Sequence, residues 1–368
     1  MKAKLRGLIS LSETTTEILN SNHESVISTS AAIPFLIAEQ STHQPILLVA
    51  HSSKRASDLV AEISEFIDGV MEFPAWETLP HERLSPNSDT VAKRIHTLLH
   101  LEDAKVVVST ARALVQPIIS SITTTPLLNL EIGKEFNFEA LLRELTLRAY
   151  SRVDLVERRG DFAVRGGIID VFPPLAQHPV RIEFFGDEIE DMKYFEISDQ
   201  RTFAPVIGTL TLIPCKEILI TQEVQARAGE LKSQYLELRE MCSKIESGIY
   251  VDGIESLAAV LHPEMKTLID FLPNNFSVVI LESERIKFVL SISSPPIKNF
   301  SKRHGQTLRS PARKLREENS RRYERSYRRV LLQILRRCVK SRKEKVFHGA
   351  TLICLATRMI LRLRSLKR

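Results

Sequence analysis

The run Pro45-Ile46-Leu47-Leu48-Val49-Ala50 is wholly apolar and has the length of a single β-strand. Two similar runs occur later, at Lys105-Val106-Val107-Val108-Ser109 and Ser277-Val278-Val279-Ile280-Leu281. Between the first two runs, residues 59–67 and 90–101 carry apolar side chains at helical spacing. Continuous apolar strands that alternate with helices are typical of a parallel sheet covered on both faces. The sequence therefore predicts an α/β domain.

A different pattern begins near residue 130. Ile168–Phe172 and Val180–Phe185 are short strand-like segments, and Gly186-Asp187 is a tight-turn signal that leads into a further segment, Glu188–Ile197. Closely spaced strands joined by glycine turns are typical of an antiparallel or mixed sheet. We predict a second, smaller sheet here, inserted into the first domain.

These patterns divide the chain into four regions. Residues 1–128 and 216–292 are predicted to be the two halves of the α/β domain, and residues 129–215 the inserted domain. Residues 293–368 form a tail of different composition. Of the whole chain, 43% is hydrophobic and 26% charged, which is ordinary for globular proteins.

Charge is distributed unevenly between the tail and the rest. Residues 293–368 hold 23 Lys and Arg against 4 Asp and Glu, a net charge of +19, whereas residues 1–292 carry a net charge of −13. Arginine-rich sequence binds nucleic acid through phosphate contacts, and nearby tyrosines can stack on bases. The candidate nucleic-acid contacts are Arg321, Arg322, Arg325, Arg328 and Arg329, with Tyr323 and Tyr327 between them.

No compartment signal or membrane span is evident. The four cysteines lie far apart, with no spacing typical of a metal site or a disulfide framework, which favours a reducing compartment. No apolar run reaches the roughly 18 residues of a membrane span. We expect a cytoplasmic protein that does not enter the membrane.

Catalytic motifs are also missing from the sequence. A phosphate-binding loop needs Gly-x-x-x-x-Gly-Lys-Ser/Thr, so that backbone amides and a lysine surround the phosphates. The segment Ser28-Thr29-Ser30-Ala31-Ala32, at the place predicted for such a loop, contains neither Gly nor Lys. We predict that this chain is not an enzyme and holds no cofactor or metal.

One face of the inserted sheet has the composition of a protein interface. In the segment 180–185, Val180, Ile182 and Phe184 share one face, and Arg181, Glu183 and Phe185 share the other. If the aliphatic face packs in the core, Arg165, Arg181 and Phe185 face outward. An exposed aromatic residue flanked by arginines is typical of an interaction hot spot. The alternative is Arg–Glu pairing across strands with Phe185 covered by a helix; the residues alone leave both open.

Several uncommon strings of the sequence resemble a known family. They are Phe73–Pro86, Arg152–Glu157, Gly160–Pro174, Arg181–Asp187, Asp199–Arg201 and Gly253–Leu257. Together they resemble the N-terminal, UvrB-like module of the bacterial transcription-repair coupling factors, the Mfd family. The resemblance covers roughly residues 1–290.

The resemblance implies a fold and a function. It implies a degenerate helicase-type (RecA-like) α/β domain, split by an inserted domain that docks on UvrA in transcription-coupled nucleotide excision repair. Arg165, Arg181 and Phe185 match the UvrA-binding positions. The DNA-gripping aromatic hairpin of UvrB has no counterpart near Trp76–Pro86, which implies binding of protein rather than DNA. In the family, the ATP- and Mg-dependent DNA translocase and the RNA-polymerase-binding domain lie further along the chain.

Past about residue 292 the resemblance ends, and the motifs of the motor do not follow. The abrupt change of composition favours a truncated family member whose tail is an out-of-frame extension. The alternative is a stand-alone basic protein that binds nucleic acid through residues 293–368.

Overall fold

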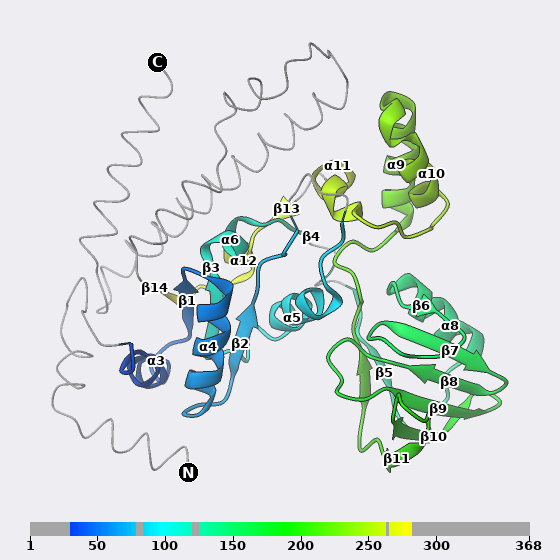
Figure 1. Cartoon of the computed structure of the whole chain (residues 1–368), viewed down its shortest axis with the longest axis horizontal. Helices are drawn as coiled ribbons and strands as arrows, with labels where there is room; N and C mark the ends of the chain where they lie inside the picture. The colour runs from blue at the N-terminus through cyan, green and yellow to red at the C-terminus, as the bar shows by residue number, and fades with distance from the viewer. Residues whose placement is uncertain (1–29, 79–83, 120–121, 123–124, 263–264, 282–368) are drawn as a thin grey trace.

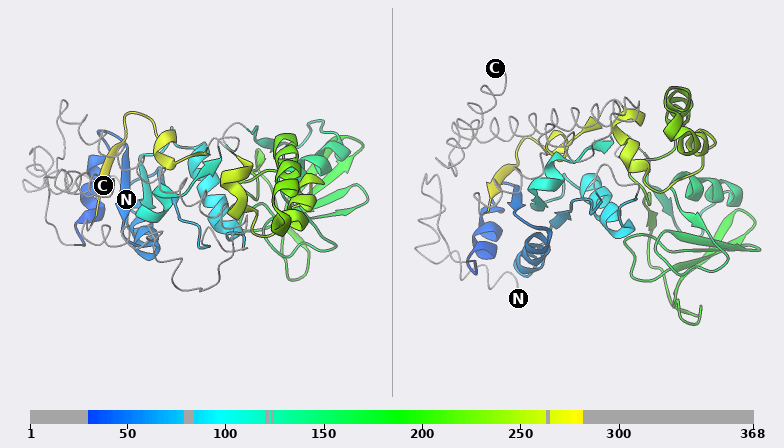
Figure 2. Two further views of the ribbon diagram at one scale, coloured as in Figure 1. Left: turned by 90° about the horizontal axis from the view of Figure 1, so that it is seen from above. Right: turned by 45° about the horizontal axis from the view of Figure 1, so that its top comes forward.

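The computed structural model describes residues 30–78, 84–119, 122, 125–262 and 265–281. Two sheets dominate this part of the chain, and Figures 1 and 2 show them at opposite ends of an elongated arrangement. In the ranges just given, no helix is long and apolar enough to cross a membrane. The predicted strand-and-helix architecture with an inserted sheet is confirmed.

The first sheet is parallel throughout and contains the three runs predicted from the sequence. Its strand order is β14-β1-β3-β2, so the last strand of the described chain pairs with the first. The strands are β1 (Ile46–Ala50), β2 (Val70–Phe73), β3 (Val106–Thr110) and β14 (Ser277–Ile280). Because β14 follows the insert in sequence, the insert interrupts a single folded unit.

Helices cover both faces of this sheet, as continuous apolar strands require. Alternate residues of β1 point to opposite sides, so that Leu48 packs with α3 (Ile33–Gln40) and α4 (Ser53–Ser64). On the other side, Leu47 belongs to the core formed with α5 (Ser88–Leu99), α6 (Ala111–Val115) and α12 (Leu268–Phe271). Both cores consist mainly of aliphatic side chains that are almost wholly buried.

Short strand pairs join the parts of the chain. The strands that enter and leave the insert, β5 (Leu128–Leu130) and β12 (Leu210–Leu212), pair with each other in antiparallel register. A second pair, β4 (Ile118–Ile119) with β13 (Met265–Lys266), ties the segment before the insert to the segment that returns to the parallel sheet. The insert is therefore closed at its base.

The inserted sheet has six strands in the order β11-β10-β9-β8-β7-β6, and only the β6–β7 pair is parallel. Its strands are β6 (Ser151–Arg152), β7 (Asp161–Arg165), β8 (Ile168–Val171), β9 (Val180–Phe185), β10 (Glu188–Phe195) and β11 (Thr202–Pro205). An antiparallel or mixed sheet was predicted here, and this prediction is confirmed.

Helix α8 (Phe138–Leu147) covers one face of the inserted sheet, which we call the inner face. Leu141 and Leu145 pack there against the aliphatic residues of β8, β9 and β10. The helix begins at Asn137, whose side chain accepts a hydrogen bond from the Ala140 amide at 2.9 Å. The second domain therefore has a hydrophobic core of its own.

Residues 218–261 form a third packed unit rather than a continuation of the parallel sheet. They comprise α9 (Gln222–Gln234), η1 (Leu236–Leu238), α10 (Arg239–Glu246), η2 (Ile254–Leu257) and α11 (Ala258–Leu261). These helices share a separate core with Ile119, Ile218 and Ile220. Of the predicted second half, 216–292, α12 and β14 pack on the parallel sheet, together with Leu219, Leu272 and Phe276. The basic tail 293–368 lies outside the described residues.

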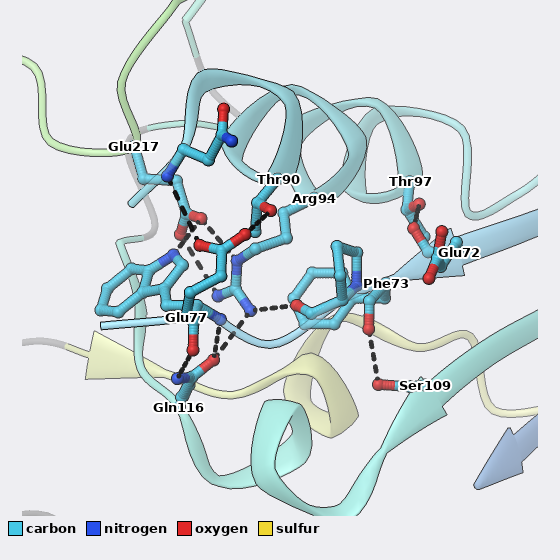
Figure 3. Close-up of polar contacts among 12 residues, drawn as sticks. Glu72, Phe73, Glu77, Thr90, Arg94, Thr97, Ser109, Gln116 and Glu217 are labelled. Carbon is cyan, nitrogen blue, oxygen red and sulfur yellow. Dashed lines mark hydrogen bonds and ion pairs between the residues drawn. The ribbon is translucent and has the colours of Figure 1, made fainter. Parts of the chain in front are cut away.

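A buried ion pair fixes the exit of the insert on the α/β domain (Figure 3). Arg94 of α5 is fully buried, and its Nε donates to Glu217 Oε1 at 2.5 Å. Trp76 Nε1 donates to the same oxygen at 2.8 Å, and the Arg94 guanidinium lies 4.2 Å from the centre of the Phe73 ring. Because Glu217 comes directly after the insert, this cluster ties the insert to α5 and to the Phe73–Trp76 segment.

Candidate functional site

The strand register places the predicted site residues on one face of the inserted sheet. Arg165 of β7 lies opposite Ile168 of β8, which in turn lies opposite Glu183 of β9. Arg181 and Phe185 share this side of β9 with Glu183, because side chains alternate along a strand. We call this side, turned away from α8, the outer face.

The inner face of β9 has the burial expected from its sequence. Val180 and Ile182 are fully buried, and Phe184 is half-buried with its ring edge-on to Phe138, 5.2 Å between centroids. The predicted division of this strand into a core side and an outward side is therefore confirmed.

Phe185 is the most conspicuous residue of the outer face, since 78% of its surface is exposed. Its register partner is Glu188 of β10, which is itself exposed. The alternative in which a helix covers Phe185 is wrong.

The turn that follows Phe185 is held in place by hydrogen bonds to the start of α8. Asp187 accepts hydrogen bonds from the Asn137 side chain at 3.0 Å and from the Phe138 amide at 3.1 Å. The bond from Asn137, followed by that from the Phe138 amide, lowers the pKa of Asp187. The exposed ring therefore projects from an anchored hairpin at the start of α8.

Arg165 is exposed at the end of β7. Its Nη2 donates to the Asp154 carbonyl oxygen at 3.0 Å. A guanidinium has five donors, so Arg165 retains hydrogen-bonding capacity toward another molecule. It lies in the same cross-strand row as Glu183, with Ile168 of β8 between them.

Arg181 is also on the outer face, but only 19% of its side chain is exposed. Its Nε and Nη2 donate to the two carboxylate oxygens of buried Asp170 at 2.7 and 2.9 Å, and Nη1 donates to the Gln200 carbonyl at 3.3 Å. The hydrogen bonds with Asp170 raise the pKa of Arg181. Sequence alternation placed Arg181 on the correct side but did not reveal that Asp170 is its partner; in the alternative left open, the partner of an arginine on this face was a glutamate across the strands.

The end of the outer face beyond Arg181 is covered by the protein itself. Ala163 of β7, Phe195 of β10 and Phe172, which follows β8, form a small core with Val156. Arg181 lies at the border, with its guanidinium 5.1 Å from the Phe195 ring centre. The outer face thus has a covered half and an open half that ends at Phe185.

The structure does not test the nucleic-acid site predicted in the basic tail. The candidate nucleic-acid contacts Arg321, Arg322, Arg325, Arg328 and Arg329 lie outside the described part of the chain. Among the residues that the structure describes, no group of three His, Cys, Asp or Glu side chains has the geometry of a metal site.

Comparison with known proteins connects the outer face to a known domain. Residues 128–217 match the family described as "UvrB interaction domain". The chain is 40% identical over 278 residues to the transcription-repair-coupling factor of Mycobacterium tuberculosis, an alignment that covers 70% of this chain and 22% of the relative.

Two further relatives carry the same description. The transcription-repair-coupling factor of Myxococcus xanthus is 32% identical over 249 residues, covering 62% of this chain and 21% of the relative. That of Escherichia coli is 33% identical over 195 residues, covering 51% and 17%. The chain thus spans about a fifth of the length of these relatives, and the resemblance predicted from the sequence is confirmed.

Proposed function

We propose that this chain, which is similar to transcription-repair-coupling factors over 70% of its length, recruits UvrA through the outer face of its UvrB interaction domain. The observation that carries the proposal is the exposed ring of Phe185, held on an anchored hairpin in that domain. Recruitment of UvrA would place the chain in transcription-coupled nucleotide excision repair.

Phe185 supplies the apolar anchor of the proposed interface. Full burial of a phenylalanine side chain is worth about 1.5–3 kcal/mol relative to exposure, and the folded chain forgoes most of this. A partner pocket that takes the ring would recover it. Because the hairpin is fixed by Asp187 and α8, little conformational entropy is lost when the ring is bound.

The two arginines have different parts in this proposal. Arg165 is exposed and provides charge-assisted hydrogen bonds to partner carboxylates or carbonyls. Arg181 contributes mainly by its fixed position, because Asp170 and Gln200 occupy three of its donor positions. Truncation of either side chain weakens the complex, but truncation of Arg181 also destabilises the sheet.

The wider activity of the relatives extends beyond this chain's proposed role. ATP-driven DNA translocation, with its Mg and its contacts to RNA polymerase and DNA, belongs in this proposal to other parts of full-length family members. The described chain contributes a protein-binding module and no catalytic residue.

The test compares three variants of the full chain for UvrA binding and thermal unfolding. Phe185→Ala and Arg165→Ala are each expected to weaken binding by about 2 kcal/mol, or about thirtyfold, with little change in melting temperature. Leu147→Ala, on α8 and 56% exposed, is the matched control and should bind like the wild type. Wild-type affinity in both face variants, with the fold intact, would refute the proposal.

The charge asymmetry supports a second candidate, a nucleic-acid-binding role for the tail. Residues 293–368 carry the net charge of +19, and such binding falls steeply with salt because counterions are released. A chain ending at Ser291 should then lose almost all affinity for DNA at physiological salt. Equal DNA affinity with and without the tail would rule this candidate out.

A further inference from the structure

Two loops of the inserted domain meet on the outer face beside the open half. Residues 153–157 lead from β6 toward β7, and residues 196–201 lead from β10 to β11. Val153 and Val156 pack on the covered half, and Arg165 holds the Asp154 carbonyl from the open half. We call these two segments the paired loops.

A single side chain, Gln200, joins the paired loops. Its Nε2 donates to the Val156 carbonyl at 3.3 Å and to the Ile197 carbonyl at 2.9 Å. Its own carbonyl accepts from Arg181 Nη1 at 3.3 Å. Gln200 therefore connects both loops to the Arg181–Asp170 pair in the sheet below.

The backbone at Gln200 shows that the position is demanding. Its φ is 61°, in the left-handed region that glycine adopts most easily. The surrounding turn is closed by hydrogen bonds from the Gln200 amide to the Glu196 carbonyl at 2.9 Å and from the Glu196 amide to the Arg201 carbonyl at 3.0 Å. Glycine would suit this backbone better, but it would lack the amide that joins the loops.

The paired loops present two apolar side chains that no core uses. Leu155 is 39% exposed and Ile197 is 38% exposed, while their neighbour Val156 is fully buried. The backbones of the two loops are brought together here, because the carbonyls of Val156 and Ile197 both accept from Gln200 Nε2. They stand on the same side of the sheet as Arg165 and Phe185.

We propose that the paired loops are a second contact region for UvrA, in which Leu155 and Ile197 touch the partner and Gln200 is a positioning residue. This inference rests on the proposed function, since it extends the same docking face. A partner that packs on Phe185 and Arg165 meets the loops at the border between the open half and the covered half of the face. Together, the two regions make one docking surface with an apolar contact at each end.

The contact test places a charge on each loop in the full chain. Leu155→Asp and Ile197→Asp are each expected to weaken UvrA binding by about tenfold, because a partner must desolvate the new carboxylate. Leu147→Asp on α8 is the matched control and should leave affinity unchanged. If an Asp variant unfolds, Leu155→Gln or Ile197→Gln replaces it, with a smaller loss expected.

The results separate this inference from the proposed function. Loss of affinity in Phe185→Ala, with full affinity in the folded Leu155 and Ile197 variants, overturns the second contact region alone. Full affinity in Phe185→Ala overturns the proposed anchor, whatever the loop variants show. Tenfold losses in the loop variants together with the loss in Phe185→Ala support both.

A double-mutant cycle tests whether Gln200 acts through the loops. Gln200→Ala is expected to weaken binding several-fold, whereas the same change made in the Ile197→Asp background should add little. Multiplied losses in the double variant would show that Gln200 does not act by placing Ile197 and would overturn its positioning role.

Discussion

The buried ion pair between Arg94 and Glu217 offers a sharp test of how the insert is held. In Glu217→Gln the shape of the side chain is kept and its charge is lost, so that the buried guanidinium of Arg94 has no counter-charge. Trp76 and Arg94 both donate to Glu217 Oε1, so in the variant they compete for the single side-chain oxygen that is left. Breaking one partner of a buried pair typically costs about 3–5 kcal/mol, and this is the expected loss in free energy of unfolding.

Chemical denaturation of the full chain, followed by circular dichroism, measures this loss. Glu190→Gln changes an exposed carboxylate on β10 and should shift the free energy of unfolding by no more than about 0.5 kcal/mol. Replacing both charges, as in Arg94→Met with Glu217→Leu, should restore most of the stability, because apolar pairs substitute well for buried ion pairs. A loss below about 1 kcal/mol in Glu217→Gln would refute the reasoning.

Three further outcomes are expected. Calorimetry should show no saturable ATP binding at micromolar concentration, because the segment Ser28–Ala32 lacks the glycines and lysine of a phosphate loop; saturable binding would contradict this. Asp187→Asn should flatten the acid dependence of the melting temperature. Because the pKa of Asp187 is lowered by folding, its stabilising contribution is present above the unfolded value near 4 and is lost as pH falls below it. Identical pH profiles of the two proteins would show that Asp187 does not anchor the hairpin. Asp170→Asn should lower the free energy of unfolding by about 3 kcal/mol, because Arg181 loses its charged partner. Urea denaturation measures this loss, and a much smaller one would contradict the expectation.

The strands of the parallel sheet were predictable where apolar residues run without interruption. Residues 45–50 and 105–109 gave β1 and β3 almost to the residue, but β2, residues 70–73, was not predicted. Its sequence Val-Met-Glu-Phe has a charge in the middle, and as an edge strand it is only partly buried. A strand that is only partly buried can carry such a charge, so no continuous apolar run marked β2 in the sequence.

Helical periodicity in the sequence indicates that a segment is helical, but it does not show where the helix breaks. Helical periodicity runs through residues 224–246, whereas the chain forms α9, breaks at Tyr235 and continues through η1 into α10. The break lets the two helices pack against each other around their own core. Tertiary packing, which a local pattern does not contain, decides where such a helix folds back.

The sequence was enough to predict on which face of the inserted sheet the candidate site lies. Strand alternation alone placed Arg165, Arg181 and Phe185 on the correct side of the sheet. The partnership of Arg181 with Asp170 depends on the β8–β9 register, which the local sequence does not fix. The paired loops were not predicted, because the hydrogen bonds of Gln200 that join them connect segments far apart in the sequence.

Site-specific photo-crosslinking at position 185 tests the central claim most directly. A photoreactive phenylalanine analogue in place of Phe185, in the full chain mixed with UvrA, should yield a covalent adduct with UvrA on irradiation. The same analogue in place of Leu147 on α8 should yield none, since that helix lies on the opposite face of the sheet. An adduct from position 147 and none from position 185 would contradict the account.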